Sequence, residues 1–108
     1  MNTERKEHIN RGDILVSSWG YDQTNATFYE AQNDARPGAF VRLMALRNHE
    51  EPRGDMTGRA SPILGSSHGD TIRRKVQVSP HCGATVRIES YEWARLWDGR
   101  AVDVSHYA

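Results

Sequence analysis

The sequence is poor in cysteine and in long apolar runs, and each scarcity excludes a class of protein. Cys82 is the only cysteine, so no disulfide can form within the chain. A small domain without disulfides is typical of a reducing compartment. The first ten residues are polar and charged and lack the apolar core of a secretion signal. No window approaches the roughly 18 apolar residues of a membrane-spanning helix. We therefore expect a cytoplasmic protein that does not contact membranes.

Large apolar side chains are also scarce. Leu, Ile, Val and Phe together account for 19 of the 108 residues, which is close to the composition of disordered chains. Two features favour a folded chain. Lys+Arg and Asp+Glu both number 14, so the net charge is zero, and three Trp, four Tyr and two Phe supply large side chains for a core. The length corresponds to one domain.

Signatures of catalysis and of metal or cofactor binding are missing as well. None of the five histidines stands in the close spacing that zinc sites use, and no glycine-rich phosphate loop is present. Gly65–Gly69 matches the G-x-S-x-G pattern of hydrolase nucleophiles, but that motif needs a strand–turn–helix on a large parallel sheet. A flexible loop explains the glycines and serines better. We expect no enzyme, no metal site and no cofactor.

Short segments rich in β-branched and aromatic residues alternate with turn residues. The pattern predicts strands at residues 13–19, 26–32, 39–47, 71–78, 84–89 and 101–105. The apolar run at 39–47 would also suit a short helix. Ser90 could cap a helical turn that reaches Trp97, with Trp93, Leu96 and Trp97 on one face. The sum predicts a mainly β fold. It is a small, partly open β-barrel of SH3-like or OB-like type, with five or six strands and one short helical turn near the C-terminus. We expect Trp93 and Trp97 in its core; the alternative is that Trp19, Tyr21, Trp93 and Trp97 stack bases.

Two segments hold little that a core could bury. Residues 1–10 show no apolar periodicity, and we expect them to form a flexible lead-in to a single domain at 11–108. Residues 48–70 contain two prolines, four glycines and few large apolar side chains. This composition predicts a long loop that is mobile or ordered by a partner.

The neutral chain contains a basic middle section. Between residues 36 and 75, eight basic residues outnumber four acidic ones, and Arg accounts for 12 of the 14 basic residues in the chain. The planar guanidinium of Arg suits phosphate and carboxylate groups. The functional interpretation is a surface for an anionic partner, nucleic acid or acidic protein. The alternative is an ordinary solvated sheet face.

Strand alternation assigns residues to this surface. It places Arg73 and Lys75 on the face opposite Ile72, Arg74, Val76 and Val78. Arg74 is therefore expected to be partly buried or paired. Tyr21, in a turn, could stack a base. The candidate partner-binding residues are Arg42, Arg47, Arg73 and Lys75, followed by Tyr21 and Asp22 in the turn of the first hairpin.

Two blocks of the sequence resemble a known family. They are Gly12–Asn25 (GDILVSSWGYDQTN), which Phe28-Tyr29-Glu30 follows, and Val86–Gly99 (VRIESYEWARLWDG). These blocks resemble a family of small uncharacterised proteins of bacteriophages, prophages and plasmids. A weaker block lies between them, with PILG at 62–65 ahead of RRKV at 73–76. The resemblance covers roughly half of the chain and brings no catalytic residues with it.

The resemblance implies a mobile-element origin rather than a reaction. Small phage and plasmid proteins without catalytic motifs often bind and inhibit host machines, CRISPR and restriction systems included. We therefore expect a non-enzymatic counter-defence protein of the anti-CRISPR type in the bacterial cytoplasm, whose partner is a host protein or nucleoprotein complex. The alternative is a small nucleic-acid-binding accessory protein on a β-barrel, and a structural or virion-associated protein is a third class.

Overall fold

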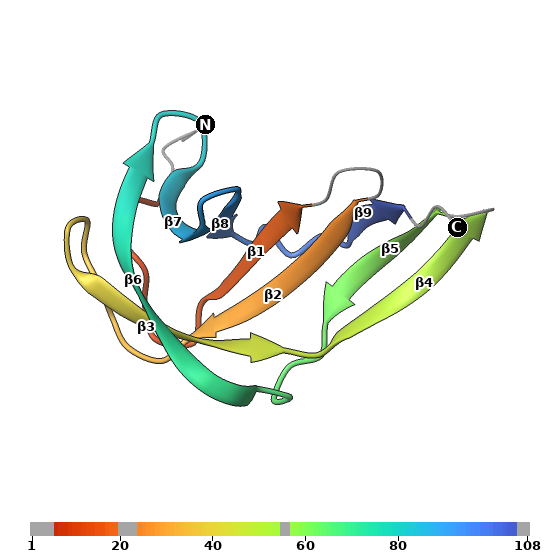
Figure 1. Ribbon diagram of the computed structural model, residues 1–108, viewed down its shortest axis with the longest axis horizontal. Helices are drawn as coiled ribbons and strands as arrows, with labels where there is room; N and C mark the ends of the chain where they lie inside the picture. Colours follow the sequence, from red (N-terminus) through yellow and green to blue (C-terminus); the bar gives the residue numbers. More distant parts are fainter. Residues whose placement is uncertain (1–5, 20–23, 55–56, 106–108) are drawn as a thin grey trace.

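The computed structural model describes residues 6–19, 24–54 and 57–105, and every helix or strand within them is a β-strand (Figure 1). Six strands form a closed antiparallel barrel in the order β1-β2-β3-β6-β7-β8. They are β1 (Ile14–Trp19), β2 (Asn25–Ala31), β3 (Phe40–Leu46), β6 (His68–Ser79), β7 (Gly83–Glu89) and β8 (Glu92–Leu96). The mainly β barrel predicted from the sequence is confirmed, but its ring of strands is closed rather than partly open.

Three further strands form a separate antiparallel sheet in the order β4-β5-β9. They are β4 (Asn48–Gly54), β5 (Thr57–Pro62) and β9 (Val102–Ser105). Figure 1 shows β4 and β5 running side by side away from the barrel, on the side opposite β6 and β7. No described residue belongs to a helix that could cross a membrane.

One side of each barrel strand fills the interior. Leu15 faces Tyr29 across β1 and β2, and Val76, Val86 and Ala94 form a row across β6, β7 and β8. All five side chains belong to one buried cluster. Because side chains alternate along a strand, the neighbours of these residues point away from the interior.

A second core covers the outer side of β1 and β2. Val16 and Phe28 are partners across these strands and pack with Ala60 of β5 and Val104 of β9. Trp97 packs edge-to-face on Phe28 with ring centroids 5.9 Å apart. Its indole N–H donates to the Arg100 carbonyl at 2.6 Å. The three-stranded sheet is thus joined to the barrel by buried apolar contacts.

The segment at residues 6–10 is part of the fold, so the predicted flexible lead-in is wrong there. Ile9 is fully buried in the barrel cluster. Its backbone exchanges two hydrogen bonds with Ala35, and the N–H of Ala84 donates to the Lys6 carbonyl at 2.8 Å. Ile9 supplies an apolar side chain to the core. Because its neighbours in the sequence are polar, no periodic pattern of apolar residues indicated this position. Residues 1–5 lie outside the described residues.

The predicted loop at 48–70 is also wrong, because β4 and β5 form a hairpin there and β6 begins at His68. Small residues make this strand pair possible. Gly58 and Ala60 are buried on β5, and a side chain added at Gly58 would stand 3.0 Å from the Glu51 carbonyl oxygen. The many small residues suggested a loop. They are needed because β5 packs closely against its neighbour β4.

The predicted helical turn at Ser90–Trp97 is wrong, because residues 92–96 form strand β8 between β7 and β1. Glu92, Ala94 and Leu96 point inward, and Trp93 and Arg95 point outward. Trp93 is 46% exposed, which corrects its predicted place in the core. Trp97 lies in the second core.

Candidate partner-binding surface

The pairing of β3 with β6 brings three of the predicted cationic residues together. Phe40 is the partner of Lys75, and Arg42 is the partner of Arg73. Val41 between them is fully buried, so Phe40 and Arg42 point outward, and both Arg73 and Lys75 are exposed. We call Phe40, Arg42, Arg73 and Lys75 the basic face.

An aromatic ring organises the basic face. The guanidinium carbon of Arg73 lies 4.0 Å from the centre of the Phe40 ring, and Phe40 is 47% exposed. This cation–π contact is worth about 0.5–1 kcal/mol at an exposed site. It leaves the N–H groups of the guanidinium open to a partner. Among the described residues, the side chains of Arg42, Arg73 and Lys75 form no ion pair.

Arg74, between Arg73 and Lys75, behaves differently, as alternation predicts. Its Nε donates to the Ile88 carbonyl at 3.0 Å, and a terminal nitrogen lies 4.0 Å from a Glu89 carboxylate oxygen. The prediction that Arg74 is partly buried or paired is confirmed. Val78, expected on the same inward side, is 43% exposed. It lies past Lys75, the last residue of β6 that has a partner in β3.

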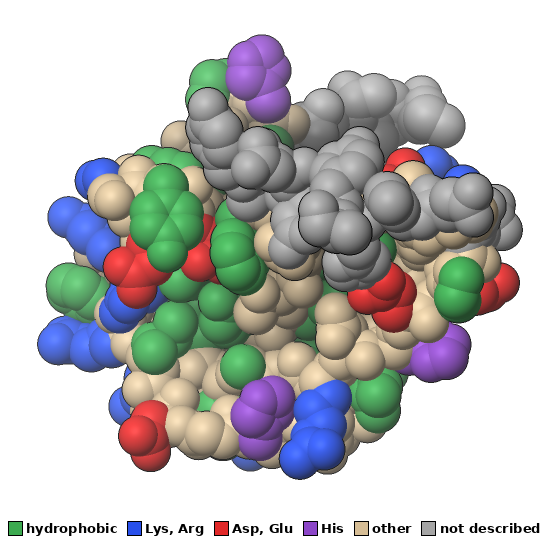
Figure 2. All heavy atoms as spheres, turned by 45° about the vertical axis from the view of Figure 1, so that its right-hand side comes forward, with side chains coloured by type: hydrophobic (Ala, Val, Ile, Leu, Met, Phe, Trp, Pro, Cys, Tyr) green, Lys and Arg blue, Asp and Glu red, His purple; other side chains and the backbone are tan. Residues whose placement is uncertain are grey.

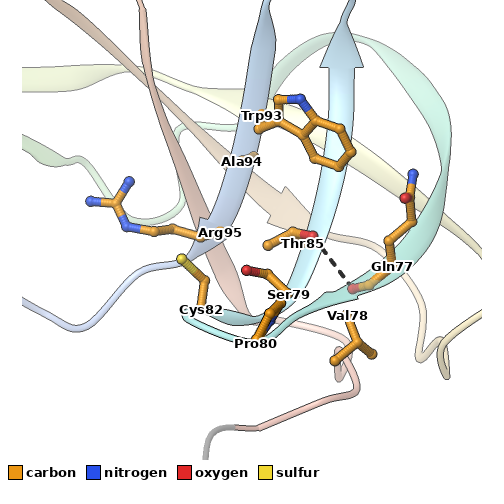
Figure 3. A pocket seen from close by; sticks show the side chains of 9 residues that line it. All are labelled: Gln77, Val78, Ser79, Pro80, Cys82, Thr85, Trp93, Ala94 and Arg95. Atoms are coloured by element: carbon orange, nitrogen blue, oxygen red, sulfur yellow. Dashed lines mark hydrogen bonds between the residues drawn. The ribbon is translucent and has the colours of Figure 1, made fainter.

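A groove of about 410 Å³ lies on the outer side of β6, β7 and β8 (Figure 3). Thr85 is the partner of both Gln77 and Arg95, so these three side chains form a row across the strands. Trp93 stands beside this row and is the partner of Arg87. The sequence favoured a core position for Trp93 over a base-stacking one, and it did not single out Arg95. Reading residues 92–96 as a strand would have placed both outside, because they are two apart.

The predicted site residue Arg47 lies outside the strand pairs that form the basic face. Arg47 follows the end of β3, and its backbone N–H donates to the Ser66 hydroxyl at 2.9 Å, in the connection between β5 and β6. Tyr21 and Asp22 lie outside the described residues. Figure 2 shows Lys and Arg side chains gathered along the left margin of its view, with hydrophobic side chains between them.

A buried polar cluster in the barrel interior is built from Ser17, Tyr29 and Glu92. The hydroxyls of Ser17 and Tyr29 both donate to the same carboxylate oxygen of Glu92, the latter at 3.3 Å. Burial raises the pKa of Tyr29, and the nearby Glu92 carboxylate raises it further. All three residues are more than nine-tenths buried. The hydrogen bonds join β1, β2 and β8 inside the closed barrel, so we assign this cluster to stability.

The G-x-S-x-G pattern lies in the connection between β5 and β6. It enters strand β6 at His68 rather than a helix. The Ser66 hydroxyl donates to the Ile63 carbonyl at 2.5 Å and so closes a turn. Within residues 6–19, 24–54 and 57–105, no three His, Cys, Asp or Glu side chains are grouped as metal ligands.

No family model, curated protein or solved structure matches the chain. The resemblance to phage and plasmid proteins therefore stays a prediction.

Proposed function

We propose that the protein works by binding rather than by catalysis, and that its partner is a single-stranded nucleic acid held on the basic face. The observation that supports this is Arg73 stacked on the exposed Phe40 ring beside Arg42 and Lys75. Proteins that bind single strands combine cations, which follow the phosphates, with aromatic rings, on which bases stack. Both components occur here on two adjacent strands.

The strand register adds an electrostatic argument. Arg42 and Arg73 are direct partners across β3 and β6. Like charges placed directly opposite each other destabilise a sheet, by an amount within the roughly 0.2–1 kcal/mol scale of cross-strand pairs. No described acidic side chain pairs with either of them. A bound phosphate would relieve this repulsion, and local conflicts of this kind concentrate at functional sites.

A second candidate function is inhibition of a host defence complex by a mobile-element protein. The sequence resemblance favours it, and exposed Arg and aromatic side chains are typical of the energetic centres of protein interfaces. Such an inhibitor would present the same face to an acidic surface or to the nucleic-acid channel of its target.

Salt-dependent binding tests the first proposal. Fluorescence anisotropy of a labelled oligothymidine of about 20 nucleotides should show binding that weakens with salt. The slope of log K against log salt should be about −2, because each of three phosphates contributes about −0.7. Arg73→Glu combined with Lys75→Glu should abolish binding while the melting temperature stays near that of the wild type. The matched control is Arg11→Glu with Arg100→Glu, the same change of charge at two exposed residues elsewhere.

The outcomes separate the two candidates. A wild-type protein that fails to bind the oligonucleotide at low salt contradicts the nucleic-acid proposal. A stable complex with a host protein that survives nuclease treatment, and is lost in the Arg73→Glu/Lys75→Glu variant, supports the inhibitor. If both charge-reversed variants lose oligonucleotide affinity equally, binding depends on overall charge and the basic face has no special role.

A further inference from the structure

We infer that the groove bordered by Trp93 and Arg95 is a subsite for one nucleotide, with the base stacked on Trp93 and a phosphate on Arg95. We call it the Trp93 groove. This inference rests on the proposed function, because the nucleotide belongs to the strand held on the basic face. It adds a second contact on other strands of the barrel.

Trp93 is free to bind in a way that Trp19 and Trp97 are not. The indole N–H of Trp19 donates to the Thr27 hydroxyl at 3.0 Å, and that of Trp97 donates to the Arg100 carbonyl at 2.6 Å. The indole N–H of Trp93 has no acceptor among the described residues, and its side chain is 46% exposed. The exposed apolar face of the ring is unfavourable in water, and a stacked base would cover it.

The groove offers the other groups that a nucleotide needs. Figure 3 shows the Trp93 ring at one end of the groove and Pro80 at the other, with Arg95 and Gln77 on opposite sides and Thr85 between them. The Arg95 side chain makes no ion pair within the part of the chain that the structure describes, so it can pair with a phosphate. The side-chain amide of Gln77 can donate and accept hydrogen bonds at a base edge.

The size of the groove limits the occupant to one residue of a strand. Its volume of about 410 Å³ lies at the small end of the range for ligand sites, about 300–1,000 Å³. The positive charge near the groove favours an anionic occupant, because Arg95 borders the groove and Arg87 stands opposite Trp93 on the neighbouring strand. A positively charged rim beside an aromatic ring complements an anionic aromatic ligand.

The groove is also continuous with the basic face. Lys75 on the basic face and Gln77 in the groove are two residues apart on β6, so they point to the same side at a separation of about 7 Å. A single strand can therefore leave the cations of β3 and β6 and place its next base on Trp93.

Abasic oligonucleotides test the base contact directly. With oligothymidine of about 20 nucleotides, Trp93→Ala should weaken binding about tenfold, the typical effect of one stacked base. The salt slope should not change, because no cation is removed. Trp93→Phe should retain most of the affinity. With an abasic strand of the same length, the wild type should lose its advantage over Trp93→Ala. With Arg95 as a fourth phosphate contact the wild-type slope becomes about −2.8 rather than about −2, and Arg95→Gln should return it to about −2.

Tyr91→Ala is the matched control, because Tyr91 is an exposed aromatic residue two positions before Trp93 and does not border the groove. Its affinity should equal that of the wild type. If Arg73→Glu/Lys75→Glu abolishes binding but Trp93→Ala binds like the wild type, the subsite is refuted and the proposed function stands. Equal wild-type affinity for thymidine and abasic strands also refutes the subsite. If the wild type binds no oligonucleotide, the proposed function and the subsite both fail.

Discussion

Removing one hydroxyl from the barrel interior, in Tyr29→Phe, should lower stability by a predictable amount. The Tyr29 hydroxyl donates to the Glu92 carboxylate at 3.3 Å, and both residues are buried. A hydrogen bond to a charged group contributes about 1.5–3 kcal/mol. Because the distance exceeds the usual O–H···O range of about 2.5–3.0 Å, we expect the lower value, about 1.5 kcal/mol. The melting temperature should fall by about 6–12 °C.

The same residue should make stability depend on alkaline pH. Burial, and then the Glu92 carboxylate, raise the pKa of Tyr29 in the folded protein above its ordinary value. Below about pH 10 the phenol is protonated in both the folded and the unfolded chain, so its contribution is constant. Above about pH 10 the unfolded chain loses the proton while the folded protein keeps it. The stabilising contribution of Tyr29 therefore falls by about 1.4 kcal/mol per pH unit.

Urea unfolding of the wild type and Tyr29→Phe, followed by circular dichroism from about pH 8 to pH 11.5, measures both effects. Other titrating groups are common to the two proteins and cancel in the difference. The stability gap should be about 1.5 kcal/mol at pH 8 and should close near pH 11. A gap below about 0.5 kcal/mol at pH 8 would refute the hydrogen-bond argument. A gap that stays constant to pH 11 would show that Tyr29 titrates alike in the folded and unfolded chains.

Two further predictions concern packing. Trp97→Ala should lower the free energy of unfolding by about 3–5 kcal/mol because Trp97 packs on Phe28, whereas Trp93→Ala should lower it by less than about 1 kcal/mol. Chemical denaturation measures both, and equal losses would contradict the assignment of Trp97 to the second core and of Trp93 to the surface. Ile9→Ala should cost about 2–5 kcal/mol because Ile9 is fully buried, and amide exchange of Ala84, whose N–H bonds the Lys6 carbonyl, should speed up. A neutral Ile9→Ala variant would mean that this segment is not needed to complete the core.

The barrel hairpins could be predicted from the sequence because their signals are local. In β6 and β7, β-branched residues alternate with charged or polar ones on either side of a short turn that begins at Pro80 and ends before Gly83. The same alternation predicted the inward position of Arg74 and the outward positions of Arg73 and Lys75. Alternation and the excess of Arg marked Arg73, Lys75 and Arg42 in advance, but the pairing of β3 with β6 that sets them beside Phe40 was not predicted.

The three-stranded sheet could not be predicted because its signals are distant in the chain. β5 consists of small and polar residues and becomes a strand through pairing with β4 on one side and β9 on the other. Its partner β9 lies about 40 residues further along the chain. Tertiary contacts therefore override a weak strand propensity. The same applies to Ile9, whose partner Ala35 is distant in sequence.

Trp93 and Trp97 show why the groove was missed. The two residues are four apart, which suits one face of a helix, but an even spacing also puts both on one side of a strand. In the structure both side chains point to the outward side of the β8 region. Whether each ring is buried depends on which other element covers that side. Beside Trp97 the three-stranded sheet completes a second core with Phe28, whereas Trp93 stays 46% exposed. Burial of an outward tryptophan thus depends on the three-stranded sheet, which could not be predicted from the sequence. The tryptophan left uncovered, with its N–H unused, borders the groove to which we assign a base.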